Sequence, residues 1–238
     1  MRPDQQEVDG SSAGELFQQG WQVYRKMVDN NYLFHREAYA TLHRALAGGF
    51  DGPFRFLDIA CGDATASVGA LRGTRIAEYH GIDLSRPALE LAARALDALD
   101  CRHSLEQGDF AEALARRSAP VDVAWVGLSL HHLQASGKLQ AMRDIRRFLG
   151  SGGIFLAYEN AGPDGESRDE WLRRWDRQEP GWSAFTRDEL VQVHDHVHGC
   201  DYPETDSTWR SLGEDAGFDS TSELYRSPSD LFRLYRFK

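Results

Sequence analysis

The sequence lacks the features that are typical of secreted proteins, of membrane-spanning proteins and of small proteins stabilised by a structural metal ion. It has three cysteines in 238 residues, Cys61, Cys101 and Cys200, and their spacing fits neither a disulfide framework nor a metal site. No apolar run approaches the roughly 18 residues that a membrane helix needs. The first residues are polar and contain no apolar segment of the kind that signal peptides carry. We therefore expect a reducing, cytoplasmic location and no membrane partner.

Basic residues are also in the minority. Lysine and arginine number 27 against 37 aspartates and glutamates, which gives a formal net charge of −10. A general nucleic-acid surface needs a basic face that neutralises phosphates, so we expect no nucleic-acid partner. The hydrophobic fraction of 41% is ordinary for a globular protein with one sizeable core. Whether the protein is a monomer or a homodimer stays open.

Strand and helix patterns alternate through the middle of the chain. Strand-like apolar segments, separated by helical patterns, occupy residues 54–60, 77–82, 102–107, 121–128 and 154–158. This alternation predicts an α/β fold with a Rossmann-like, doubly wound and mostly parallel sheet. Two further segments, 220–225 and 231–237, predict a terminal hairpin and bring the sheet to seven strands.

The remaining segments predict a tail, a lid and a cap around this core. Residues 1–15 are rich in Ser, Gly, Asp and Gln and predict a disordered tail. Residues 16–50 carry apolar side chains at three- and four-residue spacing, which predicts a helical lid. Residues 161–207 are polar with scattered tryptophans and predict a cap inserted into the core, which comprises 51–160 and 208–238.

The first strand leads into a tight turn of small residues. Asp58 lies near the end of the strand, Gly62 lies in the turn, and Asp83 ends the second strand about 20 residues later. This is the pattern of a nucleotide-binding βαβ unit, in which the turn lets a ligand approach the backbone and the second acid binds ribose hydroxyls. A dinucleotide site is disfavoured, because the turn lacks G-x-G-x-x-G and because Asp63 would repel a phosphate.

Together with two later segments, this unit resembles the class I S-adenosylmethionine-dependent methyltransferases. The matching segments follow one another in the family's order: Leu57 to Ala64, Gly81 to Ser85, Gly108 to Phe110, and Leu128 to Leu133. The last of these, Leu-Ser-Leu-His-His-Leu, is similar to small-molecule members. The resemblance covers about residues 54–155 and the terminal hairpin, whose last strand it places antiparallel at the sheet edge. The sequence departs from the family at two positions that are usually glycine, Ala60 and Ala64.

The resemblance implies S-adenosylmethionine as the cofactor and S-adenosylhomocysteine as the product. It carries over a set of cofactor-binding positions near the carboxyl ends of the strands: Asp58, Ala60, Gly62, Asp83, Leu84, Asp109, Phe110, Gly127 and Leu128. Among them, Asp83 would accept from both ribose hydroxyls, since a carboxylate accepts two donors at once.

Catalytic and acceptor-binding candidates follow from position. His131 and His132 follow the fourth strand and Glu159 follows the fifth, so each could act as a general base on the acceptor. Rings of the lid and cap are candidate acceptor contacts, or else pack among themselves: Tyr24, Tyr32, His35, Trp182 and His198. His194 and His198 stand four residues apart without a third ligand in sequence, so we predict no metal.

These observations predict methyl transfer to a small-molecule acceptor, at oxygen, at nitrogen or at a carboxylate. Two alternatives stay open. Ala60 and Ala64 motivate a methyltransferase-like binding or regulatory protein that performs no chemistry. The acidic balance motivates a protein or peptide methyltransferase that attracts basic partners.

Overall fold

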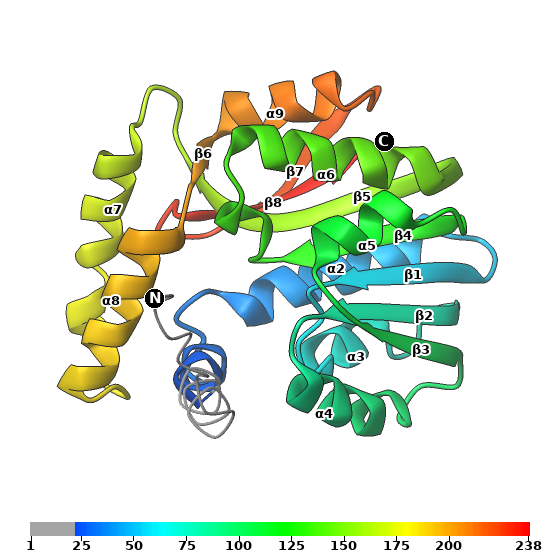
Figure 1. Cartoon of the computed structure of the whole chain (residues 1–238), viewed down its shortest axis with the longest axis horizontal. Coiled ribbons are helices and arrows are strands. Elements are labelled where there is room, and N and C mark those ends of the chain that lie inside the picture. Colours follow the sequence, from blue (N-terminus) through cyan, green and yellow to red (C-terminus); the bar gives the residue numbers. More distant parts are fainter. Residues whose placement is uncertain (1–21) are drawn as a thin grey trace, which may run out of the picture.

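The computed structural model describes residues 22–238 (Figure 1). The tail predicted at 1–15 and the start of the lid at 16–21 lie outside the described residues. Residues 22–29 are helical, and a turn at Asn30 to Leu33 separates them from α2 (His35–Gly49), as the Asp-Asn-Asn sequence predicts. Within 22–238, no helix combines the length and the apolar character that crossing a membrane requires.

One twisted sheet runs through the molecule in the order β3-β2-β1-β4-β5-β8-β7. Its strands are β1 (Phe54–Ile59), β2 (Ile76–Asp83), β3 (Arg102–Gln107), β4 (Val121–Gly127), β5 (Leu149–Gly162), β7 (Thr221–Arg226) and β8 (Phe232–Phe237). The strands from β3 to β5 pair in parallel, and β8 is antiparallel to both of its neighbours. The predicted mostly parallel sheet with an antiparallel C-terminal strand is confirmed, and a two-residue strand, β6 (Glu204–Thr205), is added beside the end of β5.

Strand β5 is longer than its apolar pattern predicts. It begins at Leu149, where the sequence predicts the end of a helix, because Val121 of β4 pairs with Leu149 and Val123 pairs with Ile154. The register shift between these pairs absorbs the glycine-rich residues 150–153, which form an irregularity in the strand rather than a loop.

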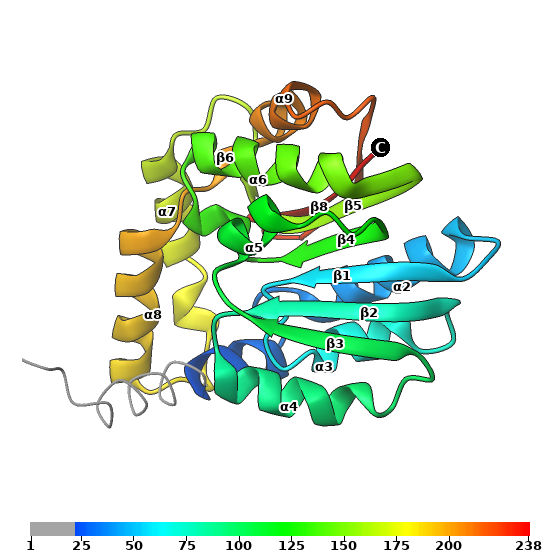
Figure 2. The same ribbon diagram turned by 45° about the vertical axis from the view of Figure 1, so that its right-hand side comes forward.

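Helices cover both faces of the sheet (Figure 2). Alternate side chains of β1 and β4 explain this: Phe56 and Trp125 enter one buried cluster, and Leu57 and Val126 enter the other. The first cluster packs against α2, α3 (Thr65–Leu71) and α4 (Arg86–Leu96); the second packs against α5 (Phe110–Arg116), α6 (Ala135–Phe148) and α9 (Asp206–Asp215). Ser85 caps α4, because its hydroxyl accepts from the Ala88 N–H at 3.0 Å.

Two further helices stand at the edge where the parallel strands end, α7 (Arg168–Asp176) and α8 (Arg187–Cys200), joined through the short helix η2 (Glu179–Gly181) (Figure 2). We call these elements the cap. Both α7 and α8 begin with a capping box, Ser167 with Glu170 and Thr186 with Glu189.

The cap and the lid are fastened to each other. Trp182 stacks on Tyr32 at 5.4 Å between ring centroids and meets Trp175 edge-on at 5.1 Å. The Tyr32 hydroxyl accepts from the Ala184 N–H at 3.0 Å, and Lys26 donates to both carboxylate oxygens of Glu189 at 2.6 and 2.8 Å. These rings therefore form a small core between lid and cap.

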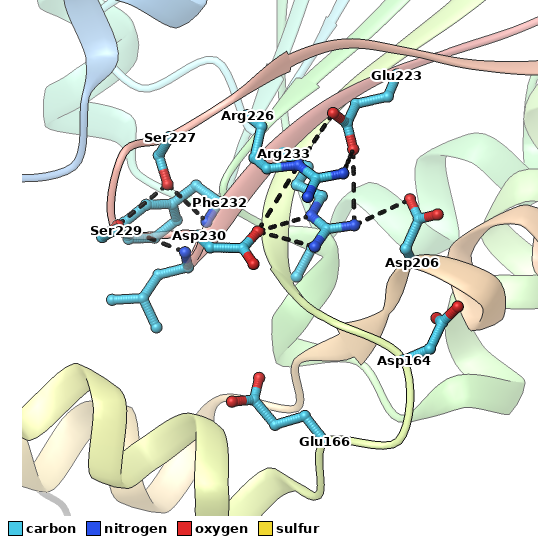
Figure 3. Close-up of polar contacts among 12 residues, drawn as sticks. Asp164, Glu166, Asp206, Glu223, Arg226, Ser227, Ser229, Asp230, Phe232 and Arg233 are labelled. Carbon is cyan, nitrogen blue, oxygen red and sulfur yellow. Dashed lines mark hydrogen bonds and ion pairs between the residues drawn. The ribbon is translucent and has the colours of Figure 1, made fainter.

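A buried arginine fastens the terminal hairpin (Figure 3). Arg233 of β8 is 2% exposed and reaches carboxylates on three elements. Its guanidinium nitrogens lie 2.8 Å from Asp230, 3.2 Å from Asp206 and 3.6 Å from Glu223. The charge of the arginine is thus matched, and the hairpin is tied to the start of α9.

Candidate functional site

A cavity of about 830 Å³ opens where the parallel strands end, between the sheet, the lid and the cap. Its walls come from the turn after β1, the ends of β2 and β4, the loop after β4, and α8. Ligands of doubly wound sheets bind at this edge, and the volume lies near the upper end of the roughly 300–1,000 Å³ usual for ligand sites.

The turn after β1 has the backbone path of a glycine-rich turn although two of its residues are alanine. Ala60, Gly62 and Ala64 have φ angles of 55°, 54° and 56°, the left-handed region that glycine favours. For an alanine this conformation costs about 1–2 kcal/mol. The departure from the family pattern therefore leaves the shape of the turn intact.

Asp83 connects this turn to the end of β2. One of its carboxylate oxygens accepts from the Gly62 N–H and the other from the Ser85 N–H, both at 2.8 Å. These bonds fix the orientation of the carboxylate, which lines the cavity together with Ala60 and Gly62. A carboxylate that accepts from backbone on both oxygens still offers lone pairs to the hydroxyls of a ligand.

Asp58 lies behind the turn and does not line the cavity. It is 2% exposed and accepts from the Tyr79 hydroxyl at 2.6 Å. Burial raises its pKa to about 7, because desolvation disfavours the charged carboxylate. The group is therefore near its midpoint at neutral pH.

The other predicted cofactor positions divide into two sets. Gly127 and Leu128 line the cavity, where a Cβ at Gly127 would lie 3.2 Å from the Tyr39 hydroxyl. Leu84, Asp109 and Phe110 do not line it. Asp109 caps α5 by accepting from the Glu112 N–H at 3.0 Å, although its loop is attached to the site through a Gly108 N–H bond to the Asp83 carbonyl at 3.0 Å.

Opposite the turn, the loop after β4 brings two histidines to the cavity. The His131 Nδ1 donates to Glu159 at 2.9 Å, and its Nε2 lies 3.7 Å from Oδ1 of Asp201. The Nδ1 of His132 lies 3.5 Å from the same Asp201 oxygen. Both histidines and Asp201 line the cavity.

Glu159 supports this loop from below and does not itself line the cavity. It is fully buried and accepts from the backbone N–H groups of Ser129 at 3.0 Å, Leu130 at 2.8 Å and His131 at 3.2 Å, besides the His131 ring. Burial would raise the pKa of Glu159, yet the bond from His131 and the backbone donors lower it. A carboxylate held in this way positions His131.

Charge is concentrated around His131. Burial lowers the pKa of His131, but the nearby Asp201 and Glu159 carboxylates outweigh it and raise the pKa above its ordinary value. The pKa of Asp201 is lowered in turn, because His131 outweighs burial. Oδ2 of Asp201 accepts from Asn160 at 2.8 Å, whereas Oδ1 has no hydrogen-bond partner in the described part of the chain.

The predicted acceptor contacts also divide. Tyr24 and His35 line the cavity, with the Tyr24 hydroxyl 3.2 Å from Nε2 of His35, and burial lowers the pKa of His35 to about 4. Tyr32 and Trp182 lie in the small core between lid and cap and do not line the cavity. His198 faces away from it and contacts Asp176 at 2.8 Å.

Sequence reasoning missed several residues that line the cavity: Tyr39, His196 and Asp201. His196 could have been found, because Val193, His196 and Val197 share a helical face and all three line the cavity. The His196 ring lies 5.2 Å from His132. Asp201 carries no such signal, since it follows the end of α8 and lies far along the chain from the histidines it meets.

Comparisons with known proteins agree with this geometry. Residues 56–153 match the model of a family described as a methyltransferase domain. The sequence has no significant match among curated proteins.

Solved structures show the same fold. The magnesium protoporphyrin IX methyltransferase of Synechocystis with bound S-adenosylhomocysteine has a TM-score of 0.63 at 14% identity, covering 92% of this chain and 93% of that one. The same enzyme with bound S-adenosylmethionine has a TM-score of 0.61 at 12% identity, covering 98% and 99%. A Bordetella parapertussis structure described as a possible exported protein has a TM-score of 0.62 at 19% identity, covering 85% and 67%.

Proposed function

We propose that the chain transfers a methyl group from S-adenosylmethionine to a small molecule held in the cavity. The match of residues 56–153 to a methyltransferase-domain model and the mostly parallel sheet support this proposal. The observation that carries this proposal is that one cavity joins the Gly62–Asp83 turn to the cluster of His131, His132 and Asp201. A nucleoside-binding edge and a polar reaction end thus share a single space.

The turn and the strand ends would hold the cofactor. We propose that Asp83 accepts from its ribose hydroxyls, while the backbone near Ala60, Gly62 and Leu128 contacts its amino-acid end. Leu84, Asp109 and Phe110 would meet the adenine where it extends past the cavity, because their loops are attached to Asp83. Asp58 would act through the turn rather than by contact. The magnesium protoporphyrin IX methyltransferase, which has this fold, contains the same cofactor in its structure.

When bound, S-adenosylmethionine supplies a methyl carbon activated by the neighbouring sulfonium. The protein then has to align the acceptor atom and exclude water. Lid and cap supply the exclusion, since the Tyr32–Trp182 stack and the Lys26–Glu189 pair hold them together beside the cavity. His131 and His132 act on the acceptor, and Glu159 positions His131.

The shape of the site favours a small acceptor over the alternatives. An acceptor attached to a protein would have to thread between lid and cap. A silent binding protein is disfavoured because Ala60 and Ala64 keep the conformation of the glycines they replace. Tyr24, Tyr39 and Trp175 line the cavity with aromatic side chains, which suits an aromatic acceptor.

Calorimetry with S-adenosylhomocysteine tests the first step, with Asp83→Ala as the variant that should lose affinity. Incubation with methyl-labelled cofactor and a cell extract, separated into small molecules and macromolecules, tests the second. We expect the label among the small molecules. Label in the protein fraction would favour the peptide alternative, and the absence of cofactor binding would overturn the proposal.

A further inference from the structure

Three ligand-type atoms converge at the acceptor end of the cavity. They are Nε2 of His131, Nδ1 of His132 and Oδ1 of Asp201, which all lie within 4.8 Å of one another. The Asp201 oxygen is 3.7 and 3.5 Å from the two nitrogens. Both distances are at or beyond the limit of a hydrogen bond. They are close to the spacing of about 3.3–3.5 Å between neighbouring ligands of a tetrahedral ion with bonds of about 2.0–2.1 Å.

The Asp201 oxygen is buried without a hydrogen-bond partner in the described part of the chain. Asp201 itself is 3% exposed, and its other oxygen is held by Asn160 at 2.8 Å. The contacts of this oxygen to the two histidines, at 3.7 and 3.5 Å, are long for a buried carboxylate, which leaves room for a cation between the three side chains.

The histidine behind this atom is oriented as metal-binding histidines are. His131 donates from Nδ1 to Glu159 at 2.9 Å, which fixes the tautomer and leaves Nε2 as the free lone pair. Glu159 is in turn held by three backbone N–H groups. Histidines that bind a metal through one ring nitrogen usually donate a hydrogen bond from the other to a carboxylate, as His131 does to Glu159.

From this geometry we propose that His131, His132 and Asp201 bind one divalent first-row metal ion, with Zn²⁺ as the best match to two imidazoles and one carboxylate. The cavity supplies the open fourth position that a catalytic site keeps. The ion also balances the charge, because Asp201 and Glu159 bring two carboxylates into a buried space. The sequence hides this site, since Asp201 is remote from the two histidines.

The role of the ion in catalysis rests on the proposed function. The binding of the ion by these three side chains does not depend on that function. Coordination would select an acceptor that carries a hydroxyl, because a bound hydroxyl loses its proton to water near neutral pH. The oxygen lone pair then forms the bond to the methyl carbon, and the carbon–sulfur bond breaks with its electron pair passing to sulfur. The products are a methyl ether, the neutral thioether and one proton.

A second histidine cluster, on the cap, provides a matched control. Asp176, His194 and His198 also place their ligand atoms within 4.8 Å of one another. They do not line the cavity, and His198 already contacts Asp176 at 2.8 Å. The double variant His194→Ala/His198→Ala removes this cluster without touching the cavity.

The test uses the full chain, stripped with a chelator and then titrated with Co²⁺, whose visible absorption reports tetrahedral coordination; calorimetry with Zn²⁺ follows. We expect one equivalent to bind in the native protein and in the double cap variant. Asp201→Asn and His132→Ala should each lose at least tenfold in affinity, and Glu159→Gln about 10–100-fold through His131. S-adenosylhomocysteine binding, measured on each variant, shows that the variant is folded.

Two results would overturn the metal site. One is the absence of Co²⁺ and Zn²⁺ binding in a native protein that binds S-adenosylhomocysteine. The other is metal binding that Asp201→Asn leaves unchanged and the double cap variant removes. Metal binding without binding of S-adenosylhomocysteine would instead support the site and count against the proposed function, so the two failures are distinguishable.

Discussion

The molecule contains two buried clusters of charge that differ in one respect. Around Arg233 each guanidinium contact has a carboxylate opposite it, at 2.8 to 3.6 Å (Figure 3). Around His131 the carboxylates of Glu159 and Asp201 lie beside His131 and His132, and Oδ1 of Asp201 has only long contacts, at 3.5 and 3.7 Å, within residues 22–238. The first cluster is complete and fastens a hairpin, whereas the second is loosely paired and borders a cavity. A loosely paired buried carboxylate that also lines a cavity is therefore a better guide to a binding site than burial of charge alone.

The largest effect is expected where the complete cluster is broken. Arg233→Ala would leave Asp206, Asp230 and Glu223 without their shared buried cation, which costs about 3–5 kcal/mol. Chemical denaturation measures the loss of unfolding free energy. The neighbouring Arg226 pairs with Glu223 at 2.9 Å but is half exposed, so Arg226→Ala should cost under about 1 kcal/mol. Equal losses in the two variants would contradict the contrast between a matched buried cation and a surface pair.

Asp58 lies between the two extremes, as a buried acid with one hydroxyl donor. Its pKa is raised from 3.8 to about 7 in the folded protein, so the unfolded chain releases the proton first as pH rises. Stability from this group is therefore complete below about pH 4 and is lost as pH rises to about 7, by roughly 4 kcal/mol at most.

Asp58→Asn removes this titration while keeping an acceptor for the Tyr79 hydroxyl. The variant should match the native protein in stability at pH 4 and exceed it at pH 8, with no bound ligand in either case. Thermal denaturation at the two pH values checks this. A difference between variant and native protein that does not change with pH would mean that the carboxylate stays charged.

Asp83 is a third kind of carboxylate, because it lines the cavity and can contact a ligand directly. Asp83→Ala should weaken binding of S-adenosylhomocysteine by about 1–3 kcal/mol, the usual cost of stranded hydrogen-bond partners. Calorimetry gives the affinity. Asp109→Ala should weaken affinity less, since Asp109 does not line the cavity and already caps α5. Unchanged affinity in Asp83→Ala would place the ribose elsewhere.

The smallest effect concerns backbone strain in the turn. Ala60→Gly and Ala64→Gly relieve a left-handed alanine at each position, and the flexibility of glycine in the unfolded chain offsets part of the gain. We expect each to raise the free energy of unfolding by up to about 1 kcal/mol. Ala66→Gly, inside α3, should lower it by about the same amount. Thermal shifts of opposite sign would confirm this, and a loss of stability in Ala60→Gly would contradict it.

The sequence predicts the centre of the sheet well because β1, β4 and most of β5 are buried on both faces and read as apolar runs. It also places Asp83, Gly62 and the two histidines, since each lies next to a strand end. It cannot place Asp201, which reaches the histidines only through the path of the cap. Nor does it reveal that Arg233 is buried, because an arginine in a terminal strand has the pattern of a solvent-facing residue.

Other differences have similar causes. Leu149 joins β5 because Val121 pairs with it, a long-range contact that no local pattern contains. Tyr32 and Trp182 read as ligand contacts but satisfy each other, and the choice between these uses depends on how lid and cap meet.

The pair formed by Lys26 and Glu189 is one of the contacts that hold the lid against the cap beside the cavity. Its lysine is 39% exposed, so the pair is worth no more than about 1 kcal/mol. An ion pair this weak is broken readily by thermal motion, and added salt weakens it further. Under the proposed function, the rates at which substrate enters and product leaves past this pair would then depend on ionic strength, even where the rate of methyl transfer does not.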